Sequence, residues 1–311
     1  MVYMNHNLPK IISILGVTAS GKTGLAVKLA QKFNGEIISA DSRQIYKEFN
    51  IGTAKPLGHW MQIENRRVFM VGAIPHHLVD MVDPKEDFTL ADYKTLAIEK
   101  IDDVLARGKL PLLVGGTALY LKAVLENWGL PQAQPDLTLR RKLENKNPTD
   151  LYNELKNKDP EGANITGSHN KRRIIRALEV IYQTAKKFSE QRKVGPPIFD
   201  TLKIGLKISK ADLSKNINHR TGEMIKNGLA EEIKLLNKKY PWNLPPMQSI
   251  GYSEFKNYFE SKISLADIAQ LIEKHSIAYA KRQMTWFKKD KTIHWIESET
   301  ETEKLIEKFL F

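Results

Sequence analysis

The sequence predicts an α/β protein: a parallel sheet flanked by helices, with an all-helical lobe inserted into it. Between residues 10 and 124, short apolar runs alternate with helical patterns, which is typical of parallel βαβ units. From about residue 126 to 201 the strand signals stop, and prolines and charged helical patterns replace them. We therefore expect a core at 1–125, a helical insertion at 126–201, and completion of the core with C-terminal helices at 202–311.

Each element of the first part has its own signal. Strands are expected where apolar runs end at turn residues, at 11–15, 36–40, 68–71, 75–80 and 110–114. A helical pattern at 25–30 follows the first strand. Thr89 can cap a second helix that runs from Leu90 to about Ala106 and ends at Gly108.

The remaining elements are mostly helical. Within the insertion, helices are expected at 140–143, 150–155 and 171–181, the last with a basic edge beside an apolar face. A strand at 202–206 resumes the sheet, and 292–296 is expected as a late edge strand. Further helices are expected at 212–227, at 264–289 and, as an exposed terminal helix, in the last ten residues.

A glycine-rich segment lies between the first strand and the first helix. It matches G-x-x-x-x-G-K-[ST] in full, with residues Gly16, Val17, Thr18, Ala19, Ser20, Gly21, Lys22 and Thr23. In this context the backbone N–H groups of the loop hold a phosphate at the helix N-terminus. Lys22 would pair with the outer phosphate oxygens, and the Thr23 hydroxyl would help to hold Mg²⁺. The core is thus expected to be P-loop NTPase-like, and the motif alone favours a nucleotide-binding, ATP-binding kinase.

Polar residues follow the second expected strand, at the sheet edge that faces the ligand crevice in open α/β folds. They are Asp41, Ser42, Arg43 and Gln44. Position alone lets Asp41 ligate Mg²⁺, act as a general base or cap a turn. The other three suit recognition of a base edge or a phosphate, although loop polarity explains Gln44 as well. The turn Gly115-Gly116-Thr117 should reach the same edge, with Thr117 pointing into the crevice.

Composition limits the class of protein. The 311 residues, 41% of them apolar, suffice for a full α/β core and a second lobe. Cysteine is absent, which excludes disulfides and thiolate metal sites. Residues 1–10 lack the apolar run of a signal peptide, and no segment approaches the roughly 20 apolar residues of a membrane span. We expect a soluble cytoplasmic protein with no membrane contact.

The net charge of +12 favours a polyanionic partner, but scattered surface lysines explain it equally well, so location must decide. Within 171–193 the only acidic residues are Glu179 and Glu190. The cations of this segment are Lys171, Arg172, Arg173, Arg176, Lys186, Lys187, Arg192 and Lys193. We interpret this imbalance as nucleic-acid contact. The basic and aromatic mixture at 279–289 can clamp nucleotides, although Trp286 fits a core better. His76 and His77 have no partners at metal spacing and are expected to be structural.

These motifs, in this order, resemble the tRNA dimethylallyltransferases (tRNA isopentenyltransferases). The landmarks span nearly the whole chain: Gly16–Thr23, Asp41–Tyr46, Gly52–Pro56, Asp83-Pro84 with Phe88, Leu113–Thr117 with Leu119-Tyr120, Arg172-Arg173 with Arg176–Val180, Ile250–Tyr252 and Ala280–Gln283 with Thr285-Trp286. Each is short, but their joint order and spacing are highly specific.

The resemblance implies a reaction. Enzymes of this family transfer a dimethylallyl group from dimethylallyl diphosphate to the N6 amine of the adenosine 3′-adjacent to the anticodon, release pyrophosphate and need Mg²⁺. Thr18, Lys22 and Mg²⁺ would stabilise charge on the departing oxygen. Arg220 matches the family's phosphate-binding arginine, and Asp41 fits as the base that accepts the amine proton.

The resemblance also implies how tRNA is held. The target base cannot react while stacked, so it should flip into a channel. The residues that would contact the base and nearby nucleotides are Asp41, Ser42, Arg43, Gln44, Thr117, Arg172, Arg173, Arg176, Lys281 and Arg282. A protein that wraps one anticodon arm is expected to be a monomer.

Three other functions compete: a kinase of a small metabolite, an RNA-binding protein without activity, and a prenyltransferase of free adenylate. The basic insertion argues against the last, because AMP needs no such surface. The chain also departs from the family pattern, with Val17 where proline is usual and with Asn216 and Ile277 where arginines are usual. We expect the two missing arginines to affect substrate affinity more than the reaction.

Overall fold

The strands around the phosphate loop form the framework of the molecule. The computed structural model describes residues 8–131, 133–260 and 263–311, so most of the segment 1–10, considered above for a signal peptide, lies outside the described residues. The chain divides into two units. The first comprises the described residues up to Phe88, Thr95–Leu121 and Ile198–Phe311, and the second comprises Thr89–Lys94 and Lys122–Pro197.

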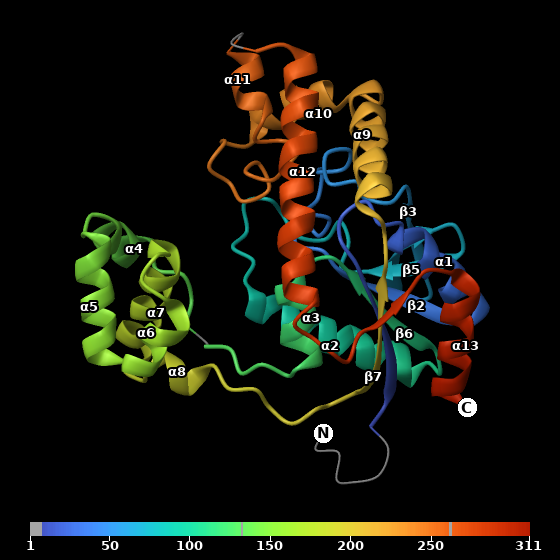
Figure 1. Cartoon of the computed structure of the whole chain (residues 1–311), viewed down its shortest axis with the longest axis horizontal. Coiled ribbons are helices and arrows are strands. Elements are labelled where there is room, and N and C mark those ends of the chain that lie inside the picture. Colours follow the sequence, from blue (N-terminus) through green and yellow to red (C-terminus); the bar gives the residue numbers. More distant parts are fainter. Residues whose placement is uncertain (1–7, 132, 261–262) are drawn as a thin grey trace. The chain divides into compact units, whose positions relative to one another are not determined.

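The first unit contains one mixed sheet, whose strand order in the described residues is β3-β4-β5-β2-β6-β1-β7-β8 (Figure 1). The bounds are β1 Lys10–Leu15, β2 Gly35–Ala40, β3 His59–Ile63, β4 Arg66–Val71, β5 Ile74–His77, β6 Leu110–Gly115, β7 Asp200–Leu206 and β8 His294–Ile296. The strands β5, β2, β6, β1, β7 and β8, adjacent in that order, pair with one another in parallel. This pairing confirms the expected parallel core.

One edge of the sheet differs from the expectation. Strands β3, β4 and β5 pair antiparallel, and β3 had no predicted counterpart. The reason is that His59–Ile63 is mostly exposed and lacks an apolar run. A strand of this kind is held by its hydrogen bonds to β4 more than by burial.

The helices associated with the sheet largely follow the predictions. They are α1 Lys22–Lys32, α2 Leu90–Ala106, α3 Ala118–Leu125, α9 Lys210–Lys226, α10 Leu229–Lys239, α11 Phe255–Phe259, α12 Leu265–Phe287 and α13 Glu299–Leu310. Thr89 caps α2 as expected, because its hydroxyl accepts from Asp92 N–H while its own N–H donates to the Asp92 carboxylate. Helices α9 and α12 pack against each other.

The prediction of an exposed terminal helix was wrong. Ile306 of α13 is fully buried, and it joins Ala26 and Leu29 of α1 in the core that covers one face of the sheet. Lys28 and Lys32 of α1 form ion pairs with glutamates of α13, and the two helices lie side by side in Figure 1. The apolar pairs 305–306 and 309–310 recur at helical spacing, which gives α13 its buried face.

The second unit is built from helices in its described residues. They are α4 Leu137–Glu144, α5 Pro148–Lys158, α6 Pro160–Thr166, α7 Lys171–Thr184 and α8 Phe188–Gln191. Its core contains Leu151, Leu155, Ile174 and Leu178, among others. The expected helices at 140–143, 150–155 and 171–181 are confirmed, whereas α6 and α8 are too short to have been foreseen from periodicity.

Candidate active site

The phosphate loop (Gly16–Thr23) has the shape that an anion requires. It leaves β1, turns through Ala19 with φ 59° and Gly21 with φ 86°, and enters α1 at Lys22. A left-handed alanine is strained, and such strain is common at ligand sites. The hydroxyl of Ser20 is buried and has no hydrogen-bond partner among the described residues. The loop therefore presents backbone N–H groups together with an unpaired hydroxyl.

Asp41 caps the turn that follows β2. Its Oδ1 accepts from the N–H groups of Arg43, at 2.8 Å, and Gln44, at 3.3 Å. The turn-capping role that position left open is thus present. No described residue donates a hydrogen bond to its other oxygen, and the side chain lines the site cavities. One carboxylate oxygen shapes the loop while the other stays available to a ligand.

Thr117 connects this segment to the neighbouring strand. Its Oγ1 accepts from Ser42 N–H at 3.1 Å, and its own N–H donates to Ala40 O at 3.2 Å. Because β6 pairs with β2, the two strand ends emerge together. Asp41 and Thr117 therefore share the same sheet edge, as expected.

These segments converge on a cavity of about 460 Å³, a size typical of small-molecule sites. The lining comes from the sheet edge and from the helices and loops beside it: Thr18, Asp41, Ser42, Arg43, Gly52, Thr53, Thr117, Arg220, Met224, Gln248, Ser249, Ile250, Gly251, Ile272, Ser276, Tyr279 and Arg282. A smaller cavity of about 40 Å³ adjoins Asp41 and is lined by Lys22, Thr23 and Gln44. Apart from the residues of the second unit and Lys281, most predicted site residues thus meet here.

The electrostatics of the site suit an anion. Burial lowers the pKa of Lys22 to about 8, although Asp41 raises it, and Arg220 lowers it further. Burial also lowers the pKa of Arg220, while Asp41 opposes that change. Burial raises the pKa of Tyr279, whose hydroxyl bonds Thr117. Two cations thus lie near one carboxylate in a partly desolvated space, where an added anion would be strongly attracted.

Gln44 and Arg43 also contribute to the local structure. The Gln44 amide nitrogen donates to the carbonyls of Thr53 and Ala54, and Arg43 donates to Pro245 O at 2.9 Å. The Gln44 amide thereby holds the segment Gly52–Pro56 against the site. The loop-polarity interpretation of Gln44 therefore accounts for part of its role.

Several lining residues were not predicted from the sequence. Ile272 and Ser276 lie on one face of α12 at helical spacing, together with Tyr279, which belongs to the segment 279–289 that was expected to clamp nucleotides. Glu232 of α10 accepts from the N–H of Ile51 and from the Tyr252 hydroxyl, at 2.7 Å. The landmarks Gly52–Pro56 and Ile250–Tyr252 are visible in the sequence. The sequence does not show that one side chain, Glu232, joins the two segments, so its role could not be predicted.

Gly52 shows why the first of these landmarks begins with glycine. An added Cβ would lie 2.4 Å from the ring of Tyr252, which fills the space above it. The next residues are held as well, because the Lys55 ammonium bonds Asp80 at 2.6 Å in a nearly buried position. This landmark therefore builds the wall of the cavity.

The predicted RNA contacts differ in their surroundings. Lys281 and Arg282 are exposed on α12, and Arg282 also lies 5.7 Å from the ring centre of Tyr279. Arg172 and Arg173 are exposed on α7 in the second unit. Arg176 instead donates hydrogen bonds within its unit: one guanidinium nitrogen donates to the carboxylate of the fully buried Glu179, and another donates to Ala133 O.

The departures from the family pattern are also placed by the structure. Asn216 of α9 contacts the phosphate loop, since its amide donates to Ala19 O at 3.1 Å. Ile277 of α12 does not line the cavity described above. Position 216 therefore lies where a cation could reach a bound phosphate.

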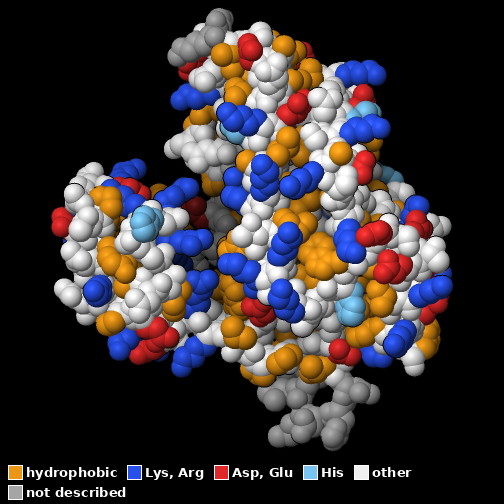
Figure 2. Space-filling view, viewed as in Figure 1, with side chains coloured by type: hydrophobic (Ala, Val, Ile, Leu, Met, Phe, Trp, Pro, Cys, Tyr) orange, Lys and Arg blue, Asp and Glu red, His pale blue; other side chains and the backbone are white. Residues whose placement is uncertain are grey.

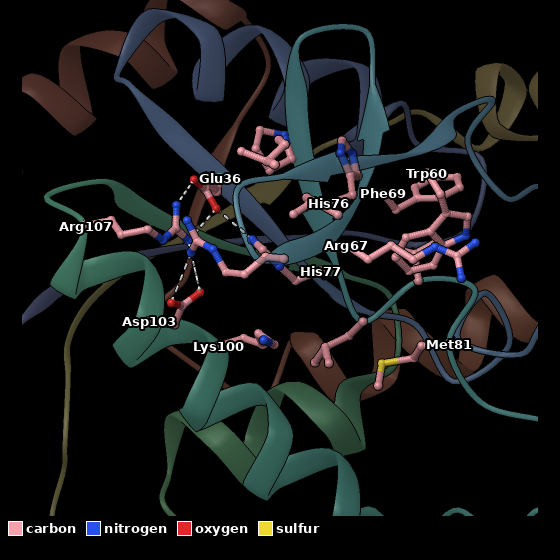
Figure 3. Close-up of a pocket in the computed structure, with 16 residues that line it drawn as sticks. Glu36, Trp60, Arg67, Phe69, His76, His77, Met81, Lys100, Asp103 and Arg107 are labelled. Atoms are coloured by element: carbon pink, nitrogen blue, oxygen red, sulfur yellow. Dashed lines mark hydrogen bonds and ion pairs between the residues drawn. The ribbon is translucent and has the colours of Figure 1, made fainter.

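A second cavity, of about 360 Å³, lies away from the phosphate loop (Figure 3). Its polar wall is an ion network in which Glu36 accepts from His77, at 2.7 Å, and from Arg107, which also reaches Asp103. Burial raises the pKa of Glu36, but the bonds from His77 and Arg107 outweigh it and bring this pKa to about 2. His77 is thus engaged structurally, and the carboxylates of this cavity are already paired.

The metal-binding capacity of the site depends on few groups. Among the described residues, no cluster of three or more His, Cys, Asp or Glu side chains could hold a metal ion. Thr23 and Asp41 nevertheless supply a hydroxyl and a carboxylate to the same small cavity. Mg²⁺ commonly takes one or two protein oxygens and completes its shell with substrate phosphates and water, so these residues fit that ion.

Comparison with known proteins gives a consistent result. The family model described as IPP transferase matches residues 44–290. A tRNA dimethylallyltransferase of Microcystis aeruginosa is 44% identical over 296 residues, which cover 95% of this chain and 90% of that protein. One of Roseiflexus sp. is 45% identical over 284 residues and covers 90% of each chain.

Solved structures agree. The tRNA Δ²-isopentenylpyrophosphate transferase of Staphylococcus epidermidis superimposes with a TM-score of 0.68 and 34% identity, over 97% of this chain and 98% of that chain. A eukaryotic dimethylallyltransferase acting on tRNA gives a TM-score of 0.75 and 32% identity, over 93% of this chain and 74% of that chain.

Proposed function

The chain belongs to the IPP transferase family, and on that premise we propose that it modifies tRNA by transferring a dimethylallyl group to it. The single observation that carries this proposal is the convergence of the phosphate loop, Asp41 and Thr117 on one cavity beside Arg220. The kinase alternative finds no support in the family match or in these relatives.

The donor is proposed to be dimethylallyl diphosphate, with its diphosphate on the phosphate loop. Backbone N–H groups, the unpaired Ser20 hydroxyl and Lys22 would bind its oxygens. Arg220 would face the same group from α9. When the C1–O bond breaks, its electron pair stays on pyrophosphate, and Thr18, Lys22 and Arg220 would stabilise the charge that develops there.

The acceptor is proposed to be the N6 amine of the adenosine 3′-adjacent to the anticodon. This amine is a poor nucleophile, because its lone pair is delocalised into the ring. It would attack C1 of the donor, and the oxygen of Asp41 that does not cap the turn would take its proton. The cavity wall of Ser42, Arg43 and Thr117 would orient the flipped base.

Mg²⁺ is the cofactor we propose, held by Thr23 with Asp41 nearby. When bound, it would neutralise charge on the diphosphate. The protein's own part is to align the loop and to keep Lys22 close to Asp41, which favours the ammonium form.

Contact with the anticodon arm is proposed for two basic surfaces. In the first unit, Lys and Arg side chains gather over α12, where Lys281 and Arg282 are exposed (Figure 2). In the second unit, Arg172 and Arg173 are exposed on α7. Cations that neutralise phosphates supply most of the sequence-independent affinity for nucleic acid.

None of the helices in the described ranges combines the length and the apolar character that a membrane span requires. We place the enzyme with its tRNA substrate in the cytoplasm. We further propose that it acts as a monomer, because one anticodon arm presents one target base.

The experiment that tests this function measures which product depends on which substrate. Protein, Mg²⁺ and dimethylallyl diphosphate are incubated with and without unmodified tRNA, and pyrophosphate is quantified. We expect pyrophosphate release that requires tRNA, with prenyl label in the RNA. A parallel incubation replaces the donor and tRNA by ATP and a metabolite acceptor, and ADP formed there, with no prenyl label in the RNA of the first incubation, would instead indicate a kinase.

A further inference from the structure

One buried amide joins the two turns that form the site. Gln283 lies on α12, on the same face as Ser276 and Tyr279 but behind the cavity wall, and is 5% exposed. Its Oε1 accepts from Thr18 N–H at 2.8 Å, and its Nε2 donates to Gly116 O at 2.7 Å. Its neighbours Lys281 and Arg282 are exposed on the same helix, whereas Gln283 points inward.

The two groups that it contacts belong to neighbouring strand-to-helix turns. Thr18 lies in the phosphate loop after β1, and Gly116 lies in the turn after β6, which pairs with β1 in parallel. Thr117, the next residue, holds Ser42 and thereby the segment of Asp41. The Gln283 amide thus fixes the spacing between the loop that would hold the donor and the segment that would hold the acceptor.

The local sequence makes room for this contact. A Cβ on Gly116 would lie 2.4 Å from Gln283 Nε2. Gly116 does not have a positive φ, so its backbone alone would accept a side chain. The approach of the amide, together with Gly16 O at 3.1 Å from the same Cβ position, explains the second glycine of Gly115-Gly116-Thr117.

We propose that Gln283 is a positioning residue, which holds the phosphate loop in register with the Thr117 turn. Its tip supplies one acceptor and one donor at the required separation. If it is removed, the buried Gly116 C=O and the part-buried Thr18 N–H lose their partner, and the carbonyl can pair again only if the loop or the turn moves. This role rests on the proposed function, but its first test needs no turnover.

The first test measures the affinity of inorganic pyrophosphate, with Mg²⁺, by calorimetry. Gln283→Leu should weaken binding roughly tenfold or more, which is the loss expected for one or two buried hydrogen bonds. In Gln283→Glu the introduced carboxylate can accept from Thr18 but repels Gly116 O. The pyrophosphate affinity of this variant, relative to wild type at the same pH, should recover as acid protonates the introduced carboxylate. Gln270→Glu, an exposed change on the same helix, should match wild type throughout.

The second test uses turnover and a double-mutant cycle. Gly116→Ala should lower kcat as Gln283→Leu does, because its Cβ displaces the amide, while the KM for tRNA stays unchanged. In a protein that already carries Gln283→Ser, Gly116→Ala should lower kcat little further, because the short serine side chain leaves free the space that the amide occupies in wild type. A cooperative thermal transition well above the assay temperature checks that each variant folds.

Wild-type pyrophosphate affinity in Gln283→Leu, or strict additivity in the cycle, would show that the amide merely fills space. If the wild-type protein itself transfers no prenyl group, the proposed function fails. The pyrophosphate titration still decides the role of Gln283 in that case.

Discussion

Single residues at this site combine a structural role, which their contacts show, with a chemical role that we propose. Asp41 caps its own turn through Oδ1 and presents the other oxygen to the cavity. Lys22 is the invariant cation of a phosphate loop, and its pKa is also sensitive to Asp41 and Arg220. A substitution that keeps the structural contacts of such a residue can therefore test its proposed chemical role alone.

Asp41→Asn makes this separation. The asparagine oxygen can still accept from Arg43 and Gln44, but it cannot take a proton from the adenine amine. We expect turnover to fall roughly 10²–10⁴-fold, with tRNA affinity nearly intact. Single-turnover transfer and a filter-binding titration measure the two quantities. Near-normal turnover in the variant would remove Asp41 from the mechanism.

Lys22 predicts a pH dependence of ligand binding. Burial lowers its pKa to about 8 in the free site, and a bound diphosphate favours the ammonium. Pyrophosphate affinity should therefore fall as the pH rises through about 8, by up to roughly tenfold per unit. Lys22→Arg keeps its positive charge over this range. The ratio of the two pyrophosphate affinities at each pH therefore removes the effect of the titration of pyrophosphate itself. A constant ratio between wild type and this variant from pH 7 to 10 would contradict the prediction.

At the scale of elements, the strongest sequence signals came from buried strands and long helices. Strands β1, β2 and β6 are almost wholly buried and rich in Ile, Leu and Val, and α2 has a capping pair and a buried face, so all four were predicted closely. Strand β3 was missed because it is mostly exposed and has no long apolar run. Ile272 and Ser276 of α12 were missed because periodicity predicts a helix without saying which loops its face will contact.

The ion network around β2 predicts acid sensitivity. The folded pKa of Glu36 is about 2, below its usual value, so its stabilisation is present above pH 4.5 and is lost as the pH falls towards 2. It amounts to about 3 kcal/mol. Urea unfolding at pH 7 and pH 3 should show Glu36→Gln less stable than wild type at pH 7, with a smaller loss in acid. Exposed Glu99→Gln on α2 is the control, and equal acid sensitivity of all three proteins would refute the assignment.

Helix α7 predicts separable effects of its arginines. Replacing Arg172 and Arg173 by glutamine should weaken tRNA binding and reduce its salt slope by roughly 0.7–0.9 per lost phosphate contact. Arg176 is left in place, because it pairs with the buried Glu179 and its loss would destabilise the second unit. Lys304 and Lys308, exposed on α13, form a control pair of equal charge. The same affinity and salt slope in both double variants would make α7 a solvated surface.

At the scale of the whole molecule, the site joins segments that are distant in sequence. The phosphate loop and the Asp41 turn come from the first quarter of the chain, Arg220 from the third and the α12 face from the last. The parallel sheet brings these two turns and the Thr117 turn to one edge. Motif order could predict that edge, since the carboxyl ends of parallel strands share it. It could not predict Glu232 or Gln283, whose partners are set by tertiary packing.

The central claim is that this cavity prenylates one adenosine of tRNA. The most direct measurement incubates the protein with Mg²⁺, dimethylallyl diphosphate and unmodified tRNA, digests the RNA and weighs both nucleosides and oligonucleotides. We expect one adenosine to gain the mass of a dimethylallyl group in the fragment that contains the anticodon, and Asp41→Asn to form this product far more slowly. Unchanged nucleosides after full incubation, or a modified nucleoside outside that fragment, would contradict the account.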